Sequence, residues 1–186
     1  MCWAEALERG GFRRDIAGDV DFDAAVKACE LAFSGAMTPS RPTENEPRKK
    51  GVIVSGEYGV GKSCLVRAIA AAFRFRPRIV DLADSREIGK LDEAWMDYNS
   101  ENLYATNVVL DDLGAEKPQN DYGIRFERAG EFIANYHARG KGRLIISTNL
   151  TTAELDSRYG GRVLSRLKDL CVPLRLTGRD KRVWTV

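Results

Sequence analysis

An eight-residue stretch, GEYGVGKS at positions 56–63, constrains the fold of this chain more than any other feature. It fills every fixed position of the pattern G-x-x-x-x-G-K-[ST], whose glycines let backbone N–H groups converge on phosphate oxygens. In that pattern Lys62 brings a cation to the β and γ phosphates of ATP, and the Ser63 hydroxyl can hold Mg²⁺. We therefore predict a nucleotide-binding P-loop made of Gly56, Glu57, Tyr58, Gly59, Val60, Gly61, Lys62, Ser63 and Cys64.

The flanking sequence supports a P-loop over its alternative, a chance match in a glycine-containing turn. Residues 51–55 (GVIVS) predict a buried strand before the loop, and residues 62–74 predict a helix after it. Further along, strands and helices continue to alternate, with a helix expected from about 123 to 139 and another carrying Ile88, Leu91 and Trp95 on one side. The pattern predicts an α/β P-loop NTPase with five parallel strands flanked by helices, the later strands being 78–82, 107–110, 143–149 and 172–178.

Two adjacent carboxylates follow the third predicted strand. Val108–Leu110 form its apolar part and deliver Asp111 and Asp112 to its carboxyl end. One acidic side chain there can hold Mg²⁺ through water, and its neighbour can orient or deprotonate the attacking water. We therefore predict Asp111 as the metal residue and Asp112 as the base; the alternative is that both simply cap a loop.

Polar residues also end the fourth strand, where Ser147, Thr148 and Asn149 follow an apolar run. The Asn149 amide can sense the γ-phosphate or its water, although an asparagine turn at a strand end is an equal alternative. His137, the single histidine, falls in the last turn of the preceding helix, where a structural role beside the helix dipole is expected.

Three arginines recur every four residues after this strand, at positions 158, 162 and 166. Val163, Leu164 and Leu167 form the apolar face of the same predicted helix, so the arginines are expected to point outward. In a nucleotide hydrolase an outward arginine can complete a neighbouring subunit's site; the alternative is a solvated helix face.

We divide the chain into an N-terminal helical segment (1–36) packed on the core, an exposed proline-rich connection (37–50) and an ATPase domain (51–186). Asp21 is predicted to cap a helix in the first segment, whose apolar stripe indicates packing on the core or, alternatively, a surface for a partner. That stripe consists of Phe22, Val26, Cys29 and Phe33.

Composition bounds the function only loosely. The net charge of +2 does not by itself indicate nucleic-acid binding, although several basic residues are candidates for DNA phosphate contacts: Arg74, Arg76, Arg78, Lys141 and Arg143. Four scattered cysteines without C-x-x-C spacing are typical of reduced thiols in the cytoplasm. The sequence has no signal-peptide pattern and no apolar run of membrane-spanning length, so we expect a soluble, cytoplasmic protein without membrane contact.

Taken in order, the motifs GEYGVGKS, NVVLDDLGAE, LIISTNL, ELDSRYGGRVLSRL and TGRDKR resemble the AAA+ domains of DnaC/DnaI-type bacterial helicase loaders and IstB-type transposition helper ATPases, over about residues 20–186. The resemblance implies a homo-oligomer with ATP at its subunit junctions and a reduced or absent helical lid. It also implies action on single-stranded DNA or on a DNA-bound helicase or transposase.

The same resemblance implies roles for individual residues: Asn149 as the sensor-one residue, Arg166 as the arginine finger, Arg162 as a second interface arginine and Arg182 as a sensor-two arginine. One departure concerns Asp112, because many AAA+ proteins have glutamate at this position; Glu116 is a substitute base, and slow hydrolysis is expected. Another is the short segment before the first strand, whereas helicase loaders usually carry a separate helicase-binding domain there.

Two rival functions remain from the sequence. A nucleotide-dependent adaptor would bind ATP and turn it over little, which the aspartate pair permits. A small-molecule P-loop kinase would need a basic mobile lid over the phosphates, and no arginine-rich insertion lies between the third and fourth strands. The leading expectation is an ATPase using ATP and Mg²⁺ to remodel or load a DNA-bound assembly.

Overall fold

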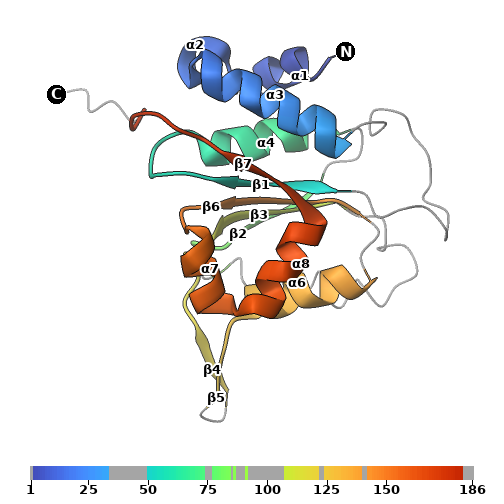
Figure 1. Cartoon of the computed structure of the whole chain (residues 1–186), viewed down its shortest axis with the longest axis vertical. Helices are drawn as coiled ribbons and strands as arrows, with labels where there is room; N and C mark the ends of the chain where they lie inside the picture. Colours follow the sequence, from blue (N-terminus) through green and yellow to red (C-terminus); the bar gives the residue numbers. More distant parts are fainter. Residues whose placement is uncertain are drawn as a thin grey trace.

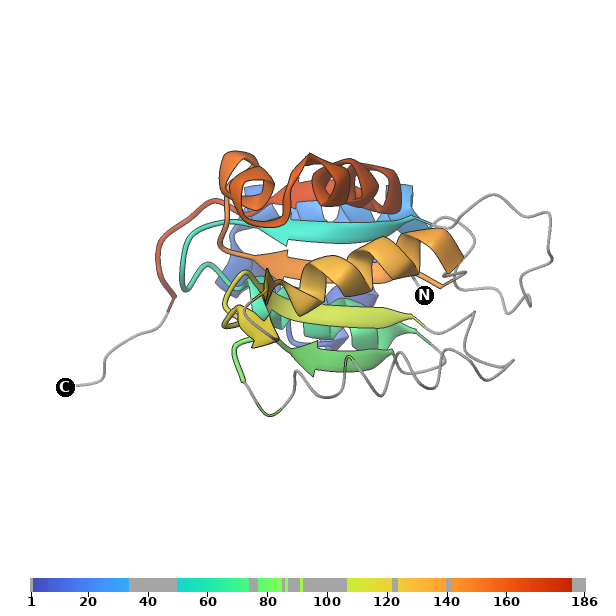
Figure 2. The ribbon, with the colours of Figure 1, turned by 90° about the horizontal axis from the view of Figure 1, so that it is seen from below.

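A parallel sheet lies between two layers of helices (Figure 1). The computed structural model describes residues 2–33, 50–73, 77–84, 86, 91, 107–121, 124–139 and 142–181. Figure 2 shows the helices of the C-terminal half crossing one face of the sheet, while the N-terminal helices lie behind it. Each face carries its own apolar cluster, so the core is split by the sheet.

The five predicted parallel strands are all present, in the order β2-β3-β6-β1-β7. Their bounds are β1 (Gly51–Ser55), β2 (Arg78–Asp81), β3 (Val108–Leu113), β6 (Leu144–Thr148) and β7 (Cys171–Arg175). Strands β3 and β6 are almost continuously buried, because helices cover both of their faces. The α/β prediction with a five-stranded parallel sheet is confirmed.

One face is covered by α1 (Trp3–Arg9), α2 (Arg14–Ala17), α3 (Asp19–Phe33) and the P-loop helix α4 (Lys62–Ala72). The ring of Trp3 lies 5.1 Å from that of Phe33 and 6.2 Å from that of Phe73, centroid to centroid, which joins α1 and α3 to the end of α4. The predicted apolar stripe of α3 therefore packs inward, with Phe22, Cys29 and Phe33 fully buried or nearly so.

The start of α3 differs from the prediction. The helix begins at Asp19, so Asp21 lies inside its first turn instead of capping it. The Asp21 carboxylate is buried and accepts hydrogen bonds from the backbone N–H (2.9 Å) and hydroxyl (3.1 Å) of Thr177. The Asp21 side chain therefore binds Thr177, a residue after β7, and does not cap α3 as the sequence predicted.

The opposite face is covered by α6 (Arg128–Arg139), α7 (Thr152–Tyr159) and α8 (Gly161–Leu170). The prediction of a helix starting near residue 123 was wrong at its beginning. Residues Ile124–Phe126 form β5, which pairs antiparallel with β4 (Gln119–Asp121) in a hairpin that projects beyond the helices (Figure 1). The alternating sequence I-R-F suits a strand, and backbone pairing with β4 replaces the first helical turn.

The single helix expected to carry all three arginines is in fact two helices. Gly160 separates α7 from α8 with φ of +82°, a conformation that a side chain disfavours and that breaks the helical path. Arg158 therefore lies on α7, whereas Arg162 and Arg166 lie on α8.

Several expectations fall outside the described residues: most of the connection 37–50, the helix positions Ile88 and Trp95, and the basic residues Arg74, Arg76, Lys141 and Arg182. Leu91 is described, and it is helical and buried. The described residues after β7, 176–181, form no helix. Among the helices that the structure describes, none has the length and apolarity needed to cross a bilayer.

Candidate nucleotide-binding site

The P-loop leaves β1 at Gly56 and enters α4 at Lys62, as the sequence predicted. Gly59 shows why this loop needs glycine: its φ is +76°, and a Cβ there would lie 1.8 Å from Oδ1 of Asp180. The loop ends at the N-terminus of an eleven-residue helix, whose free N–H groups and dipole favour a phosphate group.

Lys62 is held inside this loop. Its residue is 5% exposed, and its ammonium donates to the backbone carbonyl of Glu57 and lies 5.9 Å from the centroid of the Tyr58 ring. Ser63 is half-buried in the first turn of α4. The cation and the hydroxyl are thus fixed on the loop where phosphates and a metal ion would bind.

The two aspartates are held differently. Asp111 is 1% exposed; its Oδ1 accepts from the Ser147 hydroxyl at 2.5 Å, and its Oδ2 lies 3.3 Å from a guanidinium nitrogen of Arg67. Asp112 is half-buried with φ of +60°, and its backbone N–H donates to the same Ser147 hydroxyl at 2.8 Å. The positive φ of Asp112 interrupts the regular backbone of β3, so the side chains of Asp111 and Asp112 have different surroundings.

The electrostatics of this corner favour a cation. Burial raises the pKa of Asp112, and repulsion from Asp111 and Asp81 raises it further, although Lys62 and Arg67 act in the opposite direction. A divalent cation would relieve that repulsion. The described residues hold no cluster of three or more potential metal ligands of the His, Cys, Asp or Glu type. A Mg²⁺ ion at this corner would have few protein ligands and would take the remainder from water and phosphate oxygens.

Asn149 follows directly after β6, at the same edge of the sheet. In the strand register Thr148 pairs with Ser55, the residue before the P-loop, and also with Leu113, the last residue of β3. The side-chain Oδ1 of Asn149 is buried and has no hydrogen-bond partner in the described part of the chain. Asn149 also lines one cavity of about 850 Å³ together with Gly56 and Glu57. The P-loop, the aspartate pair and Asn149 thus meet at the carboxyl ends of adjacent strands.

Helix α8 presents its arginines away from this cavity. Leu164 and Leu167 line the cavity beside the P-loop, whereas Arg162 and Arg166 line a separate, more open depression of about 640 Å³ among α6, α7 and α8. The prediction of an outward position therefore fits Arg162, which is exposed, and Arg166, which is half-buried.

The outward position predicted for Arg158 was wrong. Its side chain is 22% exposed, and its guanidinium donates to the carbonyls of Gly114 and Glu116 and to Oε2 of Glu127. Arg158 lines the same depression as Arg162 and Arg166, but its guanidinium binds the loop after β3.

Glu116 belongs to the same group of contacts. Its buried carboxylate accepts from the Gly114 N–H at 2.8 Å and from the Tyr159 hydroxyl, and it lies 3.7 Å from Arg158. Sequence reasoning missed Ser147, Arg67 and Tyr159 as supports of the acidic residues. Ser147 was visible as a polar residue ending an apolar strand, whereas no local pattern marks Arg67 or Tyr159.

Arg143 is not available to DNA, contrary to the sequence-based suggestion. Its residue is 6% exposed; the guanidinium donates to the carbonyls of Ala32 and Lys50 and lies 5.3 Å from the centroid of the Phe33 ring. The residue thus joins α3 to the start of β1. His137 lies near the end of α6, with Nε2 2.8 Å from a carboxylate oxygen of Asp169 on α8.

The chain after β7 runs back along the P-loop. The backbone N–H of Leu176 donates to Ser55, and that of Lys181 donates to Gly59 at 3.0 Å. The Lys181 ammonium also donates to the carbonyls of Val60 and Ala17, which ties the loop to the end of α2. Residue 182, the predicted sensor-two position, follows Lys181 directly but lies outside the described residues.

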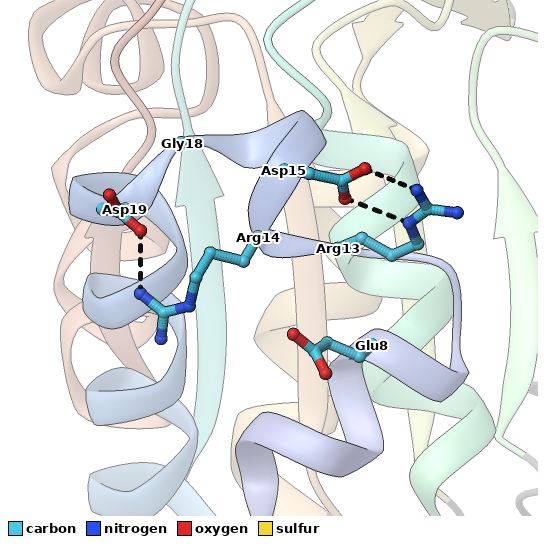
Figure 3. A pocket seen from close by; sticks show the side chains of 6 residues that line it. All are labelled: Glu8, Arg13, Arg14, Asp15, Gly18 and Asp19. Atoms are coloured by element: carbon cyan, nitrogen blue, oxygen red, sulfur yellow. Dashed lines mark hydrogen bonds and ion pairs between the residues drawn. The ribbon is translucent and has the colours of Figure 1, made fainter.

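A further, polar pocket lies among α1, α2 and the start of α3 (Figure 3). Its arginines are paired with nearby aspartates: Arg13 with Asp15 at 2.5 Å and Arg14 with Asp19 at 3.1 Å. These are exposed ion pairs of the kind that contribute little to stability, and we assign the pocket no ligand.

The fold and the P-loop edge together define an α/β P-loop protein. The chain is similar to DnaI, with a TM-score of 0.59 and 20% identity over 91% of this chain and 93% of that one. It is also similar to the DnaC helicase loader, with a TM-score of 0.55 and 22% identity over 86% and 92% of the two chains.

A third similar structure is AMPPCP-bound DnaA from Aquifex aeolicus, with a TM-score of 0.51 and 14% identity over 85% of this chain and 47% of DnaA. No family model matches the sequence, and neither does any curated protein. At these identities the likeness establishes the fold.

Proposed function

We propose that this protein binds and hydrolyses ATP with Mg²⁺ and uses the nucleotide cycle to remodel or load a DNA-bound assembly. The observation that carries the proposal is the meeting of the P-loop, the aspartate pair and Asn149 at one edge of the sheet. Ligands of open α/β sheets bind at such edges, outside the carboxyl ends of the strands.

Each residue at this edge has a defined task in the proposal. The P-loop amides and Lys62 bind the β and γ phosphates, while Ser63 and Asp111 hold Mg²⁺. Because both oxygens of Asp111 already contact protein groups, we assign it to the metal through water. Mg²⁺ supplies charge neutralisation between the phosphates, and Asn149, whose buried Oδ1 lacks a partner in the described part, senses the γ-phosphate or its water.

We assign the base to Asp112 in preference to Glu116. Glu116 already accepts hydrogen bonds from Gly114 and Tyr159, so it would have to leave both partners to take a proton.

The active unit in this proposal is a homo-oligomer with ATP at the subunit junctions. Its support is the placement of Arg162 and Arg166 in a depression separate from the cavity beside their own P-loop. A positive side chain that faces away from its own site is suited to stabilise transition-state charge in a neighbour's site.

The similarity to the DnaC helicase loader favours a helicase as the DNA-bound partner. The motif resemblance adds single-stranded DNA to the proposal as a second ligand. A transposase is the alternative partner for the same ATP-driven action. We place the protein in the cytoplasm, where its four cysteines, all free in the structure, would remain thiols.

One observation favours a second candidate, a nucleotide-dependent adaptor with little turnover. Glu116 is occupied by structural contacts, which leaves an aspartate as the only acidic side chain that we assign to the attacking water. Such a protein would bind ATP and assemble with it, but would release phosphate slowly.

The test is ATP turnover of the whole chain, with and without a single-stranded oligonucleotide, alongside size analysis with a non-hydrolysable ATP analogue. Nucleotide-dependent assembly with turnover that rises on assembly supports the ATPase. Assembly without turnover supports the adaptor. Unchanged ATP affinity in Lys62→Ala would rule out the P-loop assignment and both candidates with it.

A further inference from the structure

Two consecutive residues of α7 hold the loop that follows the aspartate pair. Arg158 donates to the carbonyls of Gly114 and Glu116, and Tyr159 donates to one oxygen of the Glu116 carboxylate. The other carboxylate oxygen accepts from the Gly114 N–H at 2.8 Å. We call these residues the α7 clamp: Gly114, Glu116, Arg158 and Tyr159.

The clamped loop is continuous with the turn that orients Asp112. The Ala115 N–H donates to the carbonyl of Asp112 at 2.9 Å, so the turn closes one residue after Gly114. The hydroxyl of Thr148 donates to the carbonyl of Leu113 at 2.6 Å, which fixes the strand side of the same turn. Since Asp112 has φ of +60°, its side-chain direction depends on this turn keeping its shape.

The other end of the clamp is continuous with α8. Only Gly160 separates Tyr159 from the first residue of α8. The Gly160 N–H donates to the carbonyl of Asp156 at 2.8 Å. Arg158 also reaches Glu127 at 3.1 Å, just before α6, and α6 packs against α8. The helix that carries Arg162 and Arg166 is therefore connected, through the α7 clamp, to the turn of Asp112.

Charge and burial make the clamp specific for these side chains. The Glu116 side chain is only 3% exposed, so its oxygens need hydrogen-bond donors from the protein. Burial raises the pKa of Tyr159, and the Glu116 carboxylate raises it further, so the phenol stays protonated and donates. The fork of Arg158 spans two carbonyls and a carboxylate at once, which a lysine ammonium on a single stem cannot match.

We propose that Arg158 is a positioning residue that couples the arginine-bearing helix α8 to the orientation of the base Asp112. Engagement of Arg162 and Arg166 by a neighbouring subunit then reaches the water-activating turn through the clamp, so assembly and hydrolysis become linked. This inference rests on the proposed ATPase function and adds to it a path from the junction to the protein's own site.

The experiment compares kcat for ATP below and above the protein concentration at which the nucleotide-bound chain assembles. For Arg158→Lys we expect the ratio of assembled to dilute kcat to fall about tenfold, with the KM for ATP, the assembly concentration and the melting temperature nearly unchanged. Tyr159→Phe removes one contact of the clamp and should lower the ratio by about threefold. Hydrogen exchange at the Gly114 amide should speed up in both variants.

Arg86→Gln is the matched control, because Arg86 forms an exposed ion pair with Asp84 away from the clamp. It should leave the ratio unchanged. Should Arg158→Lys fail to fold, Tyr159→Phe decides the question. A normal ratio in the folded variants, or a fall matched by equal loss of ATP affinity, overturns the inference alone. A wild-type chain that never hydrolyses ATP overturns the proposed ATPase as well.

Discussion

The P-loop and the α7 clamp both hold functional groups in place, but they are built in different ways. The P-loop is one continuous segment whose lysine is held by the loop's own backbone, at the carbonyl of Glu57, although Lys181 also binds the carbonyls of Gly59 and Val60. The clamp joins residues more than forty positions apart through side chains, as in the contact of Arg158 with Gly114. The first arrangement suits a fixed ligand site, and the second suits a link between moving parts.

This difference has a consequence for control of the reaction. A backbone cradle keeps its shape whether or not subunits have assembled, so nucleotide binding is expected in the monomer. A side-chain clamp responds to shifts of α7 and α8, so it is turnover that should depend on assembly. Substitutions in the two regions should therefore separate ATP affinity from kcat.

The largest effect is expected for Lys62→Ala. Removing the buried cation leaves the phosphates without their main side-chain partner, and ATP affinity should fall by about 10³-fold or more. A nucleotide titration measures this directly. Lys27→Ala, an exposed lysine on α3, is the control and should bind ATP normally.

Arg166→Ala should leave ATP affinity of the monomer intact and lower turnover of the assembly by roughly 10³-fold. The decisive measurement mixes it with Lys62→Ala, since each variant supplies the part that the other lacks. Recovered activity places the arginine in the neighbour's site. Mixed oligomers that form but stay inactive would contradict a finger supplied in trans.

Asp112→Asn should lower turnover by about 10²-fold with near-normal ATP affinity, because only the proton acceptor is lost. Asp111→Asn should instead weaken Mg²⁺-dependent ATP binding. Turnover and ATP affinity are measured for both variants. Equal losses of ATP affinity in the two variants would contradict these separate roles. If Glu116→Gln abolished turnover while Asp112→Asn kept it, the base would be Glu116.

The smallest effect on function is expected for Arg143→Met. The substitution leaves the buried carbonyls of Ala32 and Lys50 without their donor and should lower the free energy of unfolding by about 2 kcal/mol. Chemical denaturation measures the loss. ATP affinity should not change, because Arg143 joins α3 to β1 on the side of the sheet away from the P-loop edge; reduced affinity would show that this packing also shapes the site.

The sequence alone was sufficient for the sheet and for the P-loop. Buried parallel strands read as short apolar runs, and a loop that uses its own backbone to bind phosphate needs glycines at fixed spacing, so both leave local patterns. Asp111 and Asn149 also carried a local signal, since a polar residue that ends an apolar run marks the carboxyl edge, although β3 itself continues through Asp111 to Leu113. The Gly160-Gly161 pair carried a weaker signal, because a glycine can lie within a helix or end it.

Only the tertiary structure decided which arginine faces outward and which is buried. Arg143, Arg158 and Arg162 are equally charged and follow equally ordinary local sequences, yet their surroundings differ because strands and helices distant in the chain come together around them. Asp21 is a further case: it was predicted to cap α3, but it accepts a hydrogen bond from Thr177, 156 positions away. Long side chains find their partners in three dimensions, and a sequence pattern records only the partners within a few residues.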